Sequence, residues 1–122
     1  MEGFVQNSFI HSYQKSEVVF SEGNLGKEMY IIYSGGVNLY LQKKSGRRKL
    51  LTSMGVGDFF GELALVDEGP RSETAVAAKD NTQLLILDKY RFTYLLRHQP
   101  DFALIVMGKL CARLRDKNRT LS

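Results

Sequence analysis

The residues best suited to chemistry lie within positions 58–74, which combine a glycine turn, an acid, a short apolar run, a proline turn and an arginine. Glu62 directly follows Gly61, and Arg71 directly follows Pro70. A carboxylate can accept hydrogen bonds from sugar hydroxyls, and a planar guanidinium can form two parallel bonds to phosphate oxygens. Backbone N–H groups in the turns suit the remaining oxygens of such an anion. The stretch therefore predicts a clamp for one small phosphorylated ligand.

Both charged residues also have a purely structural interpretation. Glu62 could cap the short helix expected after it, and Arg71 could neutralise Glu62 or Glu68. For an isolated acid and base this interpretation is preferred, because surface ion pairs are common and weak. The glycine, proline and apolar residues around the two, at fixed spacing, favour ligand binding instead.

Short strands must position this stretch, because the chain from about residue 17 to 88 has a β-like pattern. Val37, Leu39 and Leu41 alternate with more polar residues, as in a half-buried strand. Glycine turns, such as the one at residues 34–36, separate this strand from its neighbours. We expect strands at residues 18–20, 29–33, 37–42, 49–52, 74–78 and 83–87. Their short length and near-regular spacing favour a barrel or sandwich.

Two helices are expected at the C-terminal end. Residues 89–98 have apolar positions at helical spacing after a candidate N-cap at Asp88, and Pro100 opens a second helix that reaches about residue 119. The apolar stripe of this second helix consists of Phe102, Ile105 or Val106, Leu110 and Leu114. The stripe could pack on the strands. Alternatively, together with Met107 and Leu121, it could form a seam between two copies of the chain.

Length and composition indicate one globular domain over residues 1–122. The net charge of +4 lies in residues 109–119, which hold five bases and one acid. A basic terminal helix without a reading element is a weak indication of nucleic-acid binding. No window approaches the roughly 20 apolar residues of a membrane span, and no basic leader precedes an apolar run. The single cysteine, Cys111, favours a reducing, cytoplasmic setting.

The residues give little support for an enzymatic function. Metal-dependent chemistry in a β-barrel needs clustered histidine and carboxylate ligands, whereas His11 and His98 lie at opposite ends of the chain. No Ser-His-Asp or Cys-His set stands in a strand-turn context. We therefore expect no enzyme, no metal ion and no cofactor.

Three stretches together resemble the cyclic nucleotide-binding domain, the module of catabolite activator proteins, cyclic-nucleotide-dependent kinases and gated ion channels. Residues 60–65 followed by 70–74 resemble its phosphate-binding cassette. Residues 20–23 with 29–35 resemble its first barrel strands, and residues 55–62 resemble the turn that leads into the cassette. The resemblance covers about residues 4–119 of the chain.

The resemblance implies a mainly β fold with flanking helices. Its core would be an eight-stranded β-roll, a double-stranded β-helix of jelly-roll type, over about residues 17–88. An N-terminal helical segment would precede the roll, and helices B and C would follow over about residues 89–119. In the cassette, Glu62 would accept a hydrogen bond from the ribose 2′-hydroxyl and Arg71 would pair with the cyclic phosphate. The other ligand-binding positions implied are Gly61, Leu63, Ala64, Ser72 and Thr74.

The base end of the ligand is defined more loosely. Arg115, Lys117 and Asn118 fall in the region that covers the purine in this family, sometimes from a second subunit. The residue after the cassette arginine influences the choice of base in parts of the family. Ser72 is compatible with adenine and guanine, and we favour cAMP over cGMP.

Glu73 departs from the family pattern, which commonly has alanine at this position. In an extended strand Glu73 would share a face with Arg71, where it could compete for the guanidinium or repel the phosphate. It could equally point to solvent. We predict that Glu73→Ala tightens cyclic-nucleotide binding in calorimetry, and an unchanged affinity would contradict competition.

The preferred function is a regulatory sensor in which ligand binding in the cassette moves the C-terminal helices. One alternative is the sensor half of a catabolite-activator-like transcription regulator, which would contact DNA only through a helix-turn-helix segment outside this chain. Another is a degenerate domain used only for protein contacts. A homodimer through the C-terminal helix is the expected assembly.

Overall fold

A computed structural model describes residues 9–121 of the chain, with side chains described for residues 9–116. The chain divides into two compact units, Met1–Lys89 and Tyr90–Ser122, and each is described by itself. The N-terminal helical segment implied by the resemblance would lie largely in residues 1–8, outside the described residues.

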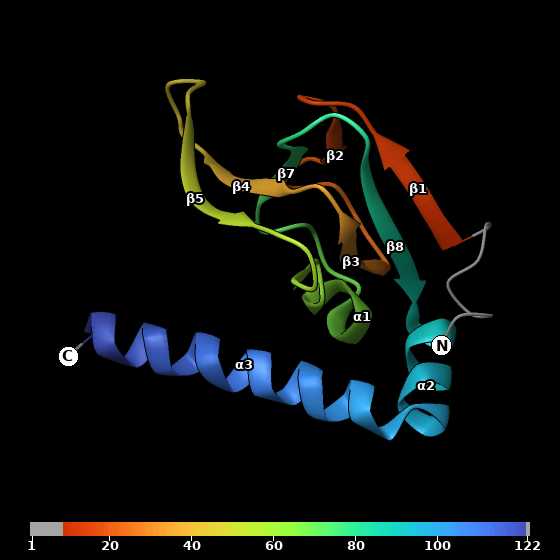
Figure 1. The fold of residues 1–122 in the computed structure, drawn as a ribbon. Helices are drawn as coiled ribbons and strands as arrows, with labels where there is room; N and C mark the ends of the chain where they lie inside the picture. Colours follow the sequence, from red (N-terminus) through yellow and green to blue (C-terminus); the bar gives the residue numbers. More distant parts are fainter. Residues whose placement is uncertain (1–8, 122) are drawn as a thin grey trace. The chain divides into compact units, whose positions relative to one another are not determined.

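The first unit is a β-roll, and the eight strands expected from the resemblance are confirmed (Figure 1). Its elements are β1 (Ile10–Tyr13), β2 (Val18–Phe20), β3 (Glu28–Ser34), β4 (Val37–Gln42), β5 (Arg48–Met54), β6 (Phe59–Phe60), α1 (Leu63–Asp67), β7 (Thr74–Ala77) and β8 (Thr82–Asp88). Two of these strands, β1 and β6, were not among the strands expected from the residue pattern.

The strands form two antiparallel sheets of four strands each, with the orders β1-β8-β3-β6 and β2-β7-β4-β5. Alternate residues of β4 point inward, since Val37 and Leu39 are buried while Leu41 emerges near the hairpin tip. The core combines these side chains with residues from both sheets: Phe20, Tyr30, Ile32, Phe60, Ala75, Leu84 and Ile86. Burial of this apolar set is the main force that holds the two sheets together.

Three aromatic rings form the end of this core that lies beneath the cassette. Tyr30 and Phe60 stack with ring centroids 5.1 Å apart and an interplanar angle of 12°. Phe20 lies against both rings, at 5.6 Å from Tyr30 and 5.8 Å from Phe60. Such offset aromatic contacts contribute about 0.5–1.5 kcal/mol each beyond burial. Phe20 also contacts the Arg71 guanidinium, so the cluster packs against the cassette.

The second unit contains α2 (Lys89–His98) from its second residue onward and the whole of α3 (Pro100–Leu121). Both agree with the helices expected at residues 89–98 and from Pro100 onward. Gln99 separates them, and its N–H donates to Leu95 O at 2.8 Å. Phe92 of α2 meets Phe102 of α3 edge to face, with 5.8 Å between centroids. In the expected stripe of α3, Phe102 and Val106 are buried, whereas Ile105 is 56% exposed.

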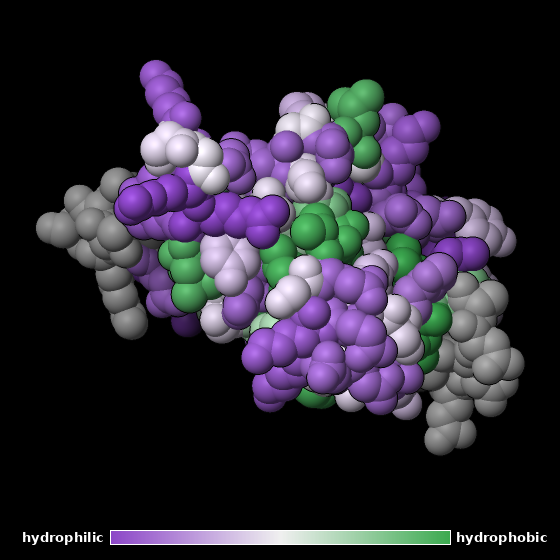
Figure 2. Space-filling view, turned by 90° about the horizontal axis from the view of Figure 1, so that it is seen from above, coloured by the Kyte–Doolittle hydropathy of each residue, from purple (hydrophilic) through white to green (hydrophobic). Residues whose placement is uncertain are grey.

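Hydrophilic residues cover most of the face shown in Figure 2, with small groups of hydrophobic residues between them. Among the described residues, no helix is long and apolar enough to cross a membrane.

Candidate functional site

The backbone of Arg71 is held by a loop that lies far away in the sequence, residues 21–27 between β2 and β3. Arg71 N donates to Asn24 O at 2.7 Å, and Gly23 N donates to Arg71 O at 2.8 Å. Leu25 and Pro70 form an isolated antiparallel bridge beside these bonds. Backbone pairing of this kind fixes the arginine at one position on the loop. We call residues 21–27 the pairing loop.

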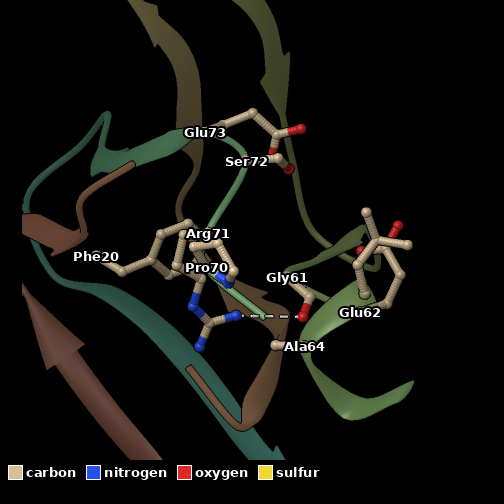
Figure 3. A pocket seen from close by; sticks show the side chains of 9 residues that line it. Phe20, Gly61, Glu62, Ala64, Pro70, Arg71, Ser72 and Glu73 are labelled. Carbon is tan, nitrogen blue, oxygen red and sulfur yellow. Dashed lines mark hydrogen bonds between the residues drawn. The ribbon is translucent and has the colours of Figure 1, made fainter. Parts of the chain in front are cut away.

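The Arg71 side chain turns inward and is only 6% exposed. Its Nη1 donates to Glu28 O at 2.8 Å and to Gly61 O at 3.2 Å, and Figure 3 shows the second bond. The guanidinium carbon lies 4.3 Å from the centre of the Phe20 ring, within cation–π range. The expected alternative, in which Arg71 neutralises Glu62 or Glu68, does not describe these bonds, because both acceptors are backbone carbonyls.

Two glycines make room for the buried guanidinium. A Cβ on Gly26 would overlap the Nε, Cζ and Nη2 atoms of Arg71, so only glycine fits the pairing loop at this position. Gly61 has φ +77°, and a Cβ there would lie 2.9 Å from Arg71 Nη1. Gly61 is also one of the implied ligand-binding positions. In this structure its lack of a Cβ permits close approach of Arg71.

Glu62 stands at the start of α1. It is the N-cap residue in helical conformation, and its side chain makes no capping hydrogen bond. The helix-capping interpretation of Glu62 is therefore wrong. The helix ends at Glu68, whose φ of 52° is left-handed, and Glu68 N donates to Ala64 O at 3.1 Å.

A cavity of about 360 Å³, which includes space open to solvent, lies between α1 and the Pro70 turn. Six of the seven predicted cassette positions line it: Gly61, Glu62, Leu63, Ala64, Arg71 and Ser72. Phe20, Pro70 and Glu73 complete the lining.

Thr74 does not line the cavity, although it was predicted with the ligand-binding residues. It is 3% exposed, and its hydroxyl accepts a hydrogen bond from Glu22 N at 2.9 Å. The Glu22 carboxylate in turn accepts a bond from Gln42 N at 2.8 Å. Thr74 therefore ties the pairing loop to β7.

Phe20 was not predicted as a site residue. The sequence offered one signal for it, its place directly before the Ser-Glu-Gly turn that opens the pairing loop. Glu73 is likewise not among the predicted ligand-binding residues, and from the sequence it is a candidate competitor for the Arg71 guanidinium. Figure 3 shows its carboxylate beside Ser72, pointing away from the Arg71 guanidinium. Competition for the guanidinium is therefore not seen in this structure.

The pKa of Tyr30 is raised to about 12, chiefly by burial and then by the nearby Glu28 carboxylate, while Arg71 acts in the opposite direction. Tyr30 is 6% exposed, so its phenol has little access to the water that would stabilise a phenolate. Tyr30 therefore remains neutral at physiological pH, and the aromatic cluster adds no negative charge near Arg71.

The predicted base-contacting residues lie in the second unit. Arg115 is exposed on α3, and the side chains of Lys117 and Asn118 lie outside the described residues. Among the described residues, no group of three His, Cys, Asp or Glu side chains is placed to hold a metal ion.

A roll with a cassette of this geometry is the architecture of cyclic nucleotide-binding proteins, and comparison with known proteins agrees. The family model described as "Cyclic nucleotide-binding domain" matches residues 10–99. The chain belongs to this family.

Among curated relatives, the chain is 37% identical over 109 residues to the Cyclic AMP receptor protein of Thermus thermophilus, covering 89% of the chain and 50% of the relative. Among solved structures, the Thermus thermophilus Catabolite Activator Protein matches with a TM-score of 0.81 and 34% identity, over 98% of this chain and 54% of that one. The chain thus spans about half the length of these relatives.

The EAL enzyme Bd1971 is a third relative, solved in cAMP-bound and cGMP-bound forms. The two forms match at 35% and 32% identity, each with a TM-score of 0.65. They cover 89% and 91% of this chain, and this chain covers 29% of each.

Proposed function

We propose that this chain is a regulatory module that binds a cyclic nucleotide in the cavity between α1 and the Pro70 turn. The observation that carries the proposal is the buried Arg71 guanidinium, fixed at the cavity wall on two backbone carbonyls. An arginine held in this way is preorganised, so little side-chain entropy remains to be lost when an anion binds.

The cavity lining suggests a role for each polar group. Arg71 would neutralise the cyclic phosphate, and the Ser72 hydroxyl would donate to one of its oxygens. Glu62, whose carboxylate does not cap α1, would accept a hydrogen bond from the ribose 2′-hydroxyl. The apolar side of the lining, Phe20 and Pro70, would exclude water from the phosphate and strengthen these charged contacts.

We favour cAMP as the ligand over cGMP. A relative named for cyclic AMP supports this choice. The relative solved with both nucleotides keeps cGMP as the alternative. The base would be covered by residues of α3, among them Arg115, Lys117 and Asn118.

Ligand binding would act by a population shift. A nucleotide that prefers one arrangement of the cassette and the C-terminal helices moves the chain towards that arrangement. Residues 1–122 would act as one domain in this process, without chemistry of its own. The chain would work in the cytoplasm.

The first test is a thermal-shift titration with cAMP and cGMP, because a ligand that binds only the folded state raises the melting temperature. At 100 times the dissociation constant the stabilisation is about 2.7 kcal/mol. Arg71→Ala should abolish the shift, and Glu68→Gln, outside the cavity, should retain it. No shift with either nucleotide at millimolar concentration would refute the proposal.

A second candidate is the sensor half of a transcription regulator, favoured by the match to a catabolite activator protein about twice as long. In that case a DNA-binding segment would lie outside this chain. Exposed apolar residues of α3, Met107 and Leu114 at 61% each, would support the expected homodimer. Sedimentation of wild-type protein and Leu114→Glu would test the dimer, since the charge should yield monomers.

A further inference from the structure

The charges in the cavity wall do not balance. The charged residues that line the cavity are Glu62, Arg71 and Glu73, so the formal charge of the lining is −1. Arg71 is the one base among them, and its Nη1 is already engaged by Glu28 O and Gly61 O. A cyclic nucleotide therefore meets one guanidinium and two carboxylates.

The two carboxylates differ in what a nucleotide can offer them. Glu62 can accept a hydrogen bond from a ribose hydroxyl under the proposed function. Glu73 lies beside Ser72, on the side of the cavity opposite the Arg71 guanidinium (Figure 3). From this position Glu73 would act on a phosphate bound at Arg71 through its charge.

We propose that Glu73 is a specificity-determining residue that selects phosphodiesters with one negative charge against phosphomonoesters with two. This inference rests on the proposed function, because it assumes that the phosphate binds at Arg71. A cyclic phosphodiester carries one charge, which Arg71 neutralises. A terminal phosphate carries about −1.5 to −2 at neutral pH, so most of a second charge remains. The lining holds no second basic side chain to neutralise that charge, and the Glu73 carboxylate repels it.

Coulomb's law gives the size of the effect. For a separation of about 8 Å and an effective dielectric constant of about 40, between the values for a protein surface and for water, one extra charge changes affinity by about fivefold. Glu73 should therefore weaken the binding of a linear nucleotide monoester by about fivefold more than it weakens the binding of a cyclic nucleotide.

The experiment compares three adenine ligands by calorimetry or by displacement of a fluorescent cyclic nucleotide. These are cAMP, 5′-AMP, and the methyl phosphodiester of 5′-AMP, which is open in shape but carries one charge. Each ligand is measured with wild-type protein, Glu73→Gln and Glu68→Gln. Glutamine keeps the size of the side chain at position 73, and Glu68 is an exposed acid outside the cavity that controls for overall charge.

In Glu73→Gln we expect the affinity for 5′-AMP to rise about fivefold more than the affinities for cAMP and the methyl phosphodiester, because 5′-AMP carries about one more negative charge. Glu68→Gln should leave all three affinities near the wild-type values. Equal changes for the three ligands, or a methyl phosphodiester that behaves like 5′-AMP, would overturn the proposal. The proposal would also be overturned if 5′-AMP failed to bind Glu73→Gln in either assay.

The design separates this inference from the proposed function. If cAMP binds the wild-type protein but the ratio of cAMP to 5′-AMP affinity is the same in Glu73→Gln, only the selectivity role of Glu73 fails. If cAMP binds no variant, the proposed function fails and the inference falls with it.

Discussion

Replacing Gly26 with alanine tests whether the pairing loop holds the cassette arginine in its buried position. The new Cβ would overlap three atoms of the Arg71 guanidinium, so the side chain must leave its place above Phe20. The φ of Gly26 is not in the left-handed region, so an alanine there introduces no backbone strain of that kind. The substitution therefore acts on the Arg71 side chain rather than on the loop backbone.

The cost can be worked from the contacts that Arg71 loses. Its Nη1 makes bonds of 2.8 and 3.2 Å, and a hydrogen bond that involves a charged group contributes about 1.5–3 kcal/mol. The contact with the Phe20 ring adds about 0.5–1 kcal/mol. Water regained by the displaced guanidinium offsets part of this sum. We expect the free energy of unfolding to fall by about 2–4 kcal/mol.

The assay is urea denaturation of four proteins: wild type, Gly26→Ala, Arg71→Ala and the double variant. Because Gly26 acts through Arg71, the second substitution should cost little in the Arg71→Ala background. Gly55→Ala is the matched control, since nothing lies within 4 Å of its new Cβ and its φ is ordinary. A Gly26→Ala protein as stable as Gly55→Ala would refute the reasoning. The same penalty with and without Arg71 would refute it as well.

Three further outcomes follow from the same contacts. The neutral Tyr30 phenol stabilises the fold below pH 10, and about 2–3 kcal/mol of the free energy of unfolding is lost as the pH rises towards the folded pKa of about 12. Tyr30→Phe should remove this part of the loss of stability at alkaline pH, as measured by denaturation at a series of pH values. Thr74→Val should lower the free energy of unfolding by about 1–2 kcal/mol, because Glu22 N loses its acceptor, and Thr74→Ser should restore most of it; equal stability of the Val and Ser variants would contradict this role. Gly61 has a φ of +77°, and an added Cβ would lie 2.9 Å from Arg71 Nη1, so Gly61→Ala should lower the free energy of unfolding by about 1–3 kcal/mol and weaken nucleotide binding in calorimetry. If both quantities were unchanged, the turn would tolerate a side chain.

The strands and helices with strong local patterns could be predicted from the sequence. The alternation in residues 37–42 and the periodic residues 89–98 correspond to β4 and α2. The strands that were missed carry little local signal. β1 reads Ile-His-Ser-Tyr and pairs with β8 some seventy residues away, and β6 is two residues long. Their pairing depends on tertiary contacts that no local pattern records.

The candidate site was predictable in its composition but not in its internal contacts. Fixed spacing brought Glu62, Arg71 and Ser72 into one lining, as expected. The direction of a long side chain depends on what surrounds it, however. The groups that surround the Arg71 guanidinium come from positions far from it in the sequence: the carbonyl of Glu28, the ring of Phe20 and Gly26, which has no Cβ. For the same reason the hydrogen bond between Thr74 and the pairing loop could not be predicted from the sequence.

The position of Arg71 also bears on the order in which the molecule can fold. Its guanidinium lies between the Phe20 ring of one sheet and the Glu28 carbonyl of the other. These groups can meet only after residues more than forty positions apart have come together, which is slow compared with helix formation. A refolding chain would thus acquire helical signal before it could capture an anion. The rate at which ligand binding recovers during refolding would then report the rate at which the two sheets come together.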